Sequence, residues 1–123
     1  MTKTTGEQWK TITHYKNFKF TGKYEISSWG NIRNATTKVP LATYSNQRGL
    51  GYLKTKIRDT DGNRRAVYIH QLVAIYFLEA PDAEGLEVNH IDCNCKNNSC
   101  TNLEWTTHAE NMREWQRLRR SAS

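Results

Sequence analysis

Two short strand patterns and a sharp helix start, all close together near the C-terminus, constrain the fold most. Residues 86–91 and 103–105 each read as a short strand, and a polar loop rich in Asn separates them. Thr107 and Glu110 then have the spacing of a capping box, in which the two side chains satisfy the free N–H groups at a helix start. The pattern predicts a hairpin with a long connection, followed at once by a helix over 108–120.

One polar residue lies on the inward face of that predicted helix. Met112, Trp115 and Leu118 form its apolar stripe. Asn111 precedes Trp115 by four positions and Leu118 by seven, so it points with the apolar stripe towards the hairpin. A polar side chain that faces a core needs a partner, which a metal ion or a buried hydrogen bond would supply.

The rest of the chain reads as an α+β protein in which a strand-rich region precedes this unit. Residues 9–43 look like short strands and turns, and 51–70 alternates as a hairpin around Asp61-Gly62-Asn63. Residues 70–78 are apolar nearly all round, as a helix buried on most sides would be. We expect His70, at its start, to be structural. The predicted organisation is a disordered segment 1–8, a strand-rich DNA-contacting region 9–69, a region 70–120 that carries the chemistry, and a tail 121–123.

Basic side chains gather on one face of the predicted 51–70 hairpin. Leu53, Thr55 and Ile57 fall on one face, which leaves Lys54, Lys56 and Arg58 on the other. A second basic stripe runs along one face of the predicted helix over 108–120. A solvated surface explains such stripes almost as well as phosphate binding does. The residues predicted to contact DNA are Lys54, Lys56, Arg58, Arg64, Arg65, Arg113, Arg117 and Arg120.

The charge distribution favours a polyanion as the partner. The chain carries a net charge of +6 with a pI near 9.4, yet residues 66–107 alone carry −5 and the flanking segments are all basic. No apolar run reaches membrane-spanning length, and residues 1–8 have no signal-peptide core, so we expect a cytoplasmic protein with no membrane partner. Three cysteines within eight positions argue against a secreted disulfide framework.

At this point the sequence resembles the HNH endonucleases, especially the phage and intron-encoded homing type. The matching positions agree in residue type and in spacing, since 12 residues separate His90 from Asn102 and 21 separate it from Asn111. The N-terminal stretch also resembles a segment that precedes the nuclease in this group. The resemblance covers about residues 9–115. Its pieces are His70-Gln71-Leu72-Val73-Ala74, Val88-Asn89-His90-Ile91-Asp92, Asn97-Asn98, Asn102-Leu103-Glu104-Trp105, Glu110-Asn111, Tyr24-Glu25-Ile26-Ser27 and Gly30-Asn31-Ile32-Arg33.

The resemblance implies a ββα-metal fold and a phosphodiester-hydrolysing site. It makes His90 the general base, a role that a largely neutral imidazole suits at pH 7. It makes Asn89 and Asn111 the ligands of one Mg²⁺ or Mn²⁺, with DNA phosphates completing the metal's shell. Asn102 is implied to pin the loop and help hold His90. We therefore expect a DNA endonuclease of a phage or mobile element, either a homing endonuclease or a nickase, in the cytoplasm of an infected bacterium.

One departure from the family concerns the metal ligands. The position of Asn89 is often Asp or His in relatives, whereas here both protein ligands are neutral amides. A hard cation held by two amide oxygens binds weakly, so we expect little metal affinity until DNA joins the site. Asp92 is the nearest carboxylate, and it could either help to bind the metal or hydrogen-bond its own loop.

The cysteines and the activity itself leave further alternatives. Cys93, Cys95 and Cys100 with His108 could form a zinc site, but their spacing is unusual for one and we expect no structural zinc. A DNA-binding protein that keeps the fold without cutting is the alternative function. The oligomeric state is left open, with a monomer favoured.

Overall fold

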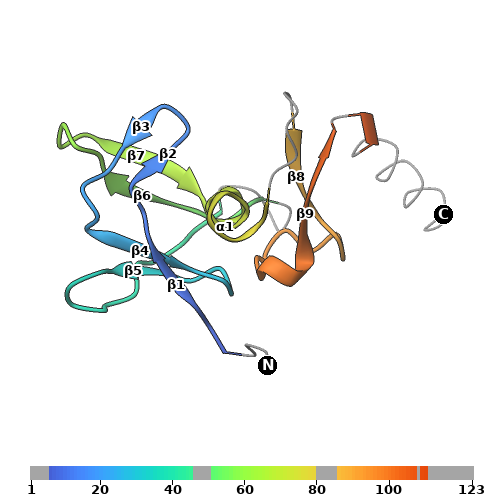
Figure 1. Ribbon diagram of the computed structural model, residues 1–123, viewed down its shortest axis with the longest axis horizontal. Coiled ribbons are helices and arrows are strands. Elements are labelled where there is room, and N and C mark those ends of the chain that lie inside the picture. The colour runs from blue at the N-terminus through green and yellow to red at the C-terminus, as the bar shows by residue number, and fades with distance from the viewer. Residues whose placement is uncertain (1–5, 46–50, 80–85, 108, 111–123) are drawn as a thin grey trace.

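A single helix joins a strand-rich region to a C-terminal hairpin. The computed structural model describes residues 6–45, 51–79, 86–107 and 109–110. Figure 1 shows the helix α1 (Ile69–Phe77) between the strand-rich region on one side and the C-terminal hairpin on the other. The remaining elements are β1 (Trp9–Thr11), β2 (His14–Tyr15), β3 (Phe18–Lys19), β4 (Tyr24–Ser27), β5 (Ile32–Asn34), β6 (Lys54–Arg58), β7 (Arg64–Tyr68), β8 (Leu86–His90), the 3₁₀ turn η1 (Cys100–Asn102) and β9 (Leu103–Thr107).

The strand-rich region is built from small antiparallel units. β4 lies in the middle of a three-stranded sheet, between β1 and β5, and its Ile26 is paired with Ile32. β2 pairs with β3, and β6 pairs with β7. Alternation explains why β6 forms a strand, because Thr55 and Ile57 are buried while Lys56 and Arg58 are exposed. The hairpin predicted over 51–70 is therefore confirmed in its strands and in its alternation.

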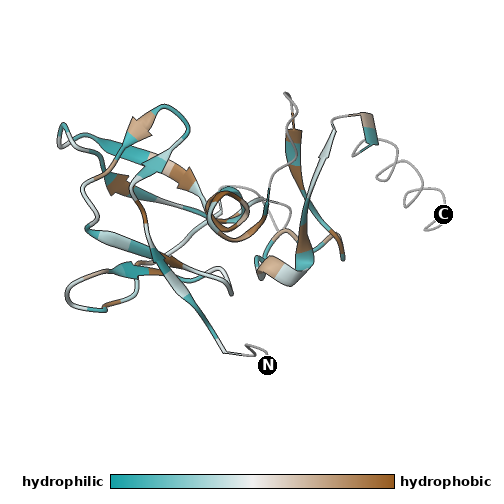
Figure 2. Ribbon diagram, in the orientation of Figure 1, coloured by the Kyte–Doolittle hydropathy of each residue, from teal (hydrophilic) through white to brown (hydrophobic). Residues whose placement is uncertain are grey.

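The helix α1 is buried because both neighbouring units pack on it. Figure 2 shows that the ribbon of α1, in the middle of the molecule, is coloured mostly as hydrophobic, and Leu72, Val73 and Ala74 are fully buried. α1 contacts β4 and β7 on one side and β8, β9 and η1 on the other. One core cluster runs through the helix, from Ile26 in the strand-rich region to Leu103 in the hairpin. No helix among the described residues is long and apolar enough to cross a membrane.

The observed α+β architecture agrees with the fold class expected from the sequence, including the strand pair that belongs to a ββα unit. Gln8 is the last residue of the segment 1–8, which the sequence predicts to be disordered, and it is hydrogen-bonded to the turn after β4. Gln8 and Ser28 exchange two hydrogen bonds, at 3.0 and 2.8 Å, because Gln8 continues the alignment of β1 beside β4. Residues 1–5 and 121–123 lie outside the described residues, as does the helix predicted over 108–120 apart from 109–110, which are helical.

Candidate active site

The register of the C-terminal hairpin decides which side chains share a face. Asn89 of β8 is paired with Glu104 of β9, and His90 is paired with Leu103. Neighbouring residues of a strand point to opposite faces, so Asn89 and His90 leave the strand in different directions. Both side chains are buried, with 9% and 4% of their surface exposed. The hairpin therefore presents two distinct polar positions at the end of β8.

The ring of His90 is held by a hydrogen bond to the loop that follows it. Its Nε2 lies 2.7 Å from Oδ1 of Asn98, which is itself buried. An amide oxygen can only accept a hydrogen bond, so Nε2 carries the ring proton. Nδ1 then carries the lone pair that a general base needs. Asn98 thus selects the tautomer of the histidine.

Two other aromatic rings lie beside the His90 ring, one stacked and one tilted. The Tyr52 ring is stacked near it with centroids 5.6 Å apart, and the His70 ring lies 5.2 Å away. Burial among these groups lowers the pKa of His90, while the hydrogen bond with Asn98 and the charge of Asp92 oppose that shift. A lowered pKa keeps the ring neutral at pH 7, which is the form that accepts a proton.

His70 lies much closer to the candidate base than its position in the sequence suggested. It is the second residue of α1 and is buried, and its ring is stacked on Tyr52 with centroids 4.5 Å apart. Burial and then the neighbouring His90 and Lys16 lower the pKa of His70 to about 3. His70 therefore stays neutral and packs beside His90, consistent with the structural role expected for it.

Asn102 and Asp92 organise the loop between the two strands. Nδ2 of Asn102 donates to Oδ1 of Asp92 and to the backbone oxygen of Asn97, both at 2.9 Å. Oδ1 of Asn102 accepts from the backbone N–H of Asp92 at 3.1 Å. Asp92 also accepts from the Asn94 backbone and the Asn97 amide, and these bonds lower the pKa of its carboxyl group, with that of Asn97 first. Asp92 therefore hydrogen-bonds its own loop, which is one of the two roles that the sequence left open for it. Asn102 braces the same loop through its three hydrogen bonds.

Asn89 has an orientation that suits a metal ligand. Its Nδ2 donates to Oε2 of Glu104 at 2.9 Å, which leaves its Oδ1 as the acceptor atom. An amide oxygen beside a carboxylate is the kind of donor set that Mg²⁺ and Mn²⁺ accept. Among the described residues, no group of three or more His, Cys, Asp or Glu side chains is placed to hold a metal ion. No disulfide joins Cys93, Cys95 and Cys100, and His108 lies outside the described residues.

The boundary between β9 and the next helix is formed as the sequence predicts. The backbone N–H of Glu110 donates to Oγ1 of Thr107 at 3.2 Å, and the backbone N–H of Thr107 donates to Oε1 of Glu110 at 3.2 Å. This reciprocal pair is a capping box. Asn111 follows directly, but it lies outside the described residues together with Arg113, Arg117 and Arg120.

The basic hairpin splits into two groups. One face of the hairpin carries Lys54, Lys56, Arg58 and Arg64. The register pairs Arg58 with Arg64, and Lys54 and Lys56 share the face of Arg58 because alternate residues of a strand point the same way. Arg65 is paired with buried Ile57 and lies on the other face. Its Nε is 2.8 Å from Oδ2 of Asp59, and its guanidinium packs over the Phe18 ring. The structure brings the first four together and separates Arg65 from them.

Three residues of the site were not singled out for a role from the sequence: Asn98, Glu104 and Tyr52. Glu104 had a usable signal, since pairing the two predicted strands places it opposite Asn89. Asn98 appeared only as part of a matching motif, and Tyr52 comes from a segment distant in sequence. Their contacts with His90 depend on how the loop and the two regions pack.

Family models match both parts of the chain. The description "NUMOD4 motif" matches residues 7–65, and "HNH endonuclease" matches residues 67–113. We refer below to residues 7–65 as the NUMOD4 region. The boundary between the two matches falls in β7, immediately before α1.

Relatives and a solved structure agree with these matches. Two uncharacterized HNH endonucleases of Acanthamoeba polyphaga mimivirus are 36% and 45% identical over 86% and 81% of this chain, which spans 25% and 29% of them. The DNA endonuclease I-HmuI of Bacillus phage SP01 is 32% identical over 85% of this chain and 55% of its own length. A solved structure of DNA binding and cleavage by the HNH homing endonuclease I-HmuI superposes with a TM-score of 0.73 at 31% identity, covering 89% of this chain and 57% of that one. Residues 67–113 therefore match the HNH endonuclease family, and the chain is similar to HNH endonucleases over more than four fifths of its length.

Proposed function

We propose that this chain is a divalent-metal-dependent DNA endonuclease that acts as a homing endonuclease or nickase. The observation that carries the proposal is the buried His90, whose Nε2 is hydrogen-bonded to Asn98 inside the hairpin of the HNH match. The HNH endonuclease match supports the reaction class, and the DNA cleavage of I-HmuI supports DNA as the substrate. The chain spans about half the length of I-HmuI and less than a third of the two mimivirus proteins. The proposal therefore depends on the site described above and not on the relatives alone.

In the proposed reaction, His90 takes a proton from water at Nδ1 as the water attacks the phosphorus atom. Asn98 keeps the ring in the tautomer that leaves this nitrogen free. Asn102 and Asp92 hold the loop that carries Asn98. Water attack breaks the bond between phosphorus and the 3′ oxygen, and the leaving 3′ oxygen takes a proton from solvent, which gives 5′-phosphate and 3′-hydroxyl ends.

Asn89 and Asn111 are the proposed ligands of one Mg²⁺ or Mn²⁺, together with DNA phosphates. Glu104 orients the Asn89 amide so that its oxygen is available. Bound there, the cation would absorb negative charge on the phosphate and the leaving oxygen. Neutral amide ligands add no charge, so we propose that the metal binds weakly until DNA contributes its phosphates.

The test is an incubation of supercoiled plasmid with the protein and Mg²⁺ or Mn²⁺. We expect nicked or linear product from the wild type, and none from His90→Ala, because that variant lacks the base. DNA binding by His90→Ala should persist, since the basic face of the hairpin is unchanged. A monomer with one site would nick one strand.

The exposed histidine of β2 provides the control, and His14→Ala should cut as the wild type does. If His90→Ala cuts at the wild-type rate, the mechanism is wrong. If the wild type binds DNA but leaves the plasmid intact in both metals, the chain is the non-cutting DNA-binding protein of the alternative function.

A further inference from the structure

The turn between β4 and β5 touches the loop that holds His90, although the two belong to different matched regions. The backbone oxygen of Ser28 accepts a 2.8 Å hydrogen bond from the N–H of Cys100, in η1. Gly30 lies against Asn98 so closely that an added Cβ would stand 2.7 Å from the Asn98 Cβ and 2.9 Å from its backbone oxygen. The NUMOD4 region therefore contacts the residue that hydrogen-bonds the candidate base.

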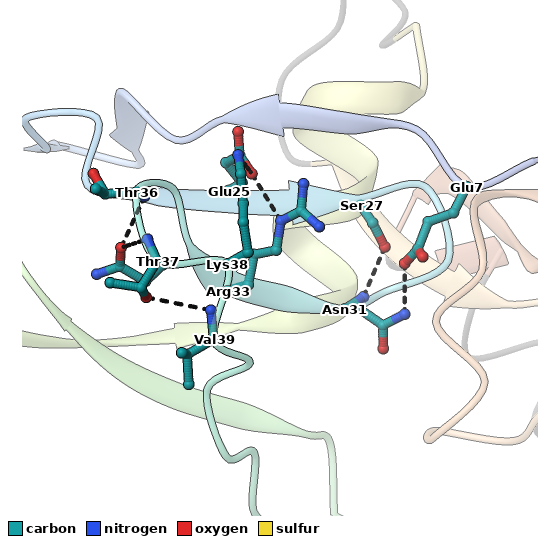
Figure 3. Close-up of polar contacts among 10 residues, drawn as sticks. Glu7, Glu25, Ser27, Asn31, Arg33, Thr36, Thr37, Lys38 and Val39 are labelled. Carbon is teal, nitrogen blue, oxygen red and sulfur yellow. Dashed lines mark hydrogen bonds and ion pairs between the residues drawn. The ribbon is translucent and has the colours of Figure 1, made fainter.

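The turn is held firmly enough to act as a support. Oγ of Ser27 accepts hydrogen bonds from the backbone N–H groups of Trp29 and Asn31, at 3.2 and 3.0 Å. The Asn31 amide donates to Glu7 at 2.6 Å. Figure 3 shows Asn31 bonded both to Ser27 and to Glu7, which fastens the far side of the turn to the segment before β1.

Two properties make glycine the residue that this position needs. Gly30 has a φ of +90°, which L side chains rarely adopt. It also leaves room for the approach of Asn98, which any side chain would block. Gly62, in the turn between β6 and β7, has a similar φ of +82° but nothing within 4 Å of an added Cβ. The two glycines thus share the backbone requirement and differ in the contact.

We propose that the β4–β5 turn of the NUMOD4 region is a positioning element of the nuclease site, in which Gly30 sets the place of Asn98 and Asn98 fixes the tautomer of His90. The proposal rests on the proposed function for its effect on catalysis. It gives the NUMOD4 region a part in aligning the base, in addition to any part in DNA binding. Asn98 and Gly30 are positioning residues, since they act through His90.

The first experiment compares Gly30→Ala with Gly62→Ala. Both carry the same backbone strain, but only Gly30→Ala pushes on Asn98. We expect kcat of Gly30→Ala to fall by about 10- to 100-fold, because displacements near 1 Å can cost that much. KM should change little, and kcat of Gly62→Ala should stay at the wild-type value. Equal kcat values for the two variants would overturn the proposal.

The second experiment reads the tautomer directly, in protein without DNA or metal. Nitrogen-15 spectra of the histidine rings, assigned by comparison with His90→Ala, distinguish a protonated ring nitrogen from one with a lone pair. We expect Nε2 of His90 to be protonated in the wild type and in Asn98→Asp, which keeps an acceptor. The nearly isosteric Asn98→Leu, which cannot accept, should show a mixture of tautomers, and Gly30→Ala should shift towards that mixture.

These spectra separate the two proposals and remain usable if Gly30→Ala folds poorly. A wild type that cuts no DNA but shows the expected tautomers would end the nuclease proposal and leave the positioning of His90 by Asn98 in place. Identical His90 spectra in the wild type and Asn98→Leu would overturn the positioning role whether or not the protein cuts.

Discussion

At the residue scale, Asp92 is the side chain whose role the structure changes most. The sequence left it between metal ligand and loop brace. Its two carboxylate oxygens accept from the Asn94 backbone, the Asn97 amide and the Asn102 amide. A carboxylate with three donors already in place has little capacity left for a cation, which favours the brace.

Asp92→Ala separates the two roles by its response to metal. As a brace, the variant should lose about tenfold or more in cleavage rate, because the loop that carries Asn98 loosens. That loss should be the same at limiting and at saturating Mg²⁺, and the melting temperature should fall. Cleavage rates measured across a metal titration check this. Recovery of the wild-type rate in excess metal would make Asp92 a ligand instead.

At the scale of elements, the β6–β7 hairpin is the part of the described chain that we propose contacts DNA. Lys54, Lys56, Arg58 and Arg64 share its outer face. Log affinity for DNA falls as log salt concentration rises, and each phosphate contact makes this slope steeper by about 0.9. Replacing all four with Gln should weaken DNA binding and reduce that slope by roughly 2 to 4. Fluorescence anisotropy with a duplex at several salt concentrations measures both quantities.

Arg65→Gln is the matched control for this hairpin. Its guanidinium is engaged by Asp59 and Phe18 on the opposite face, so the variant should lower stability and leave the salt slope unchanged. A fourfold variant with the wild-type slope would mean that the outer face is only a solvated surface.

The elements that the sequence predicted well are those with a local signal. Alternation in 53–58 and the apolar run of 70–78 are patterns contained within each segment, and the structure has β6 and α1 there. Alternation could also have separated Arg64 from Arg65, because adjacent strand residues face opposite ways. The two-residue strands β2 and β3 are too short to leave a periodic pattern.

In the candidate site too, the sequence predicts contacts between residues that are close in sequence but not those between distant residues. The capping box of Thr107 and Glu110 was predictable because its partners are three residues apart. The contact of Gly30 with Asn98 joins residues 68 positions apart and depends on the packing of the two regions on α1. No spacing rule encodes such a contact, so the support of His90 had to come from the structure.

At the scale of the whole molecule, α1 ties the NUMOD4 region and the hairpin into one core. We expect thermal unfolding to be a single transition, because exposing either face of α1 would expose apolar surface that belongs to both units. Far-UV circular dichroism and tryptophan fluorescence should give the same melting temperature, since Trp9 and Trp105 report on different sides of α1. Two separated transitions would show that the regions are independent.

The close approach of Gly30 to Asn98 limits how nucleases of this kind can be recombined in the laboratory. A chimera that joins a foreign NUMOD4 region to this hairpin would need glycine at the equivalent of position 30 and a carbonyl oxygen in reach of Cys100. A donor chosen only for the DNA sequence it recognises would meet neither requirement by design. The exchangeable unit is therefore the NUMOD4 region together with the loop of Asn98 that it contacts.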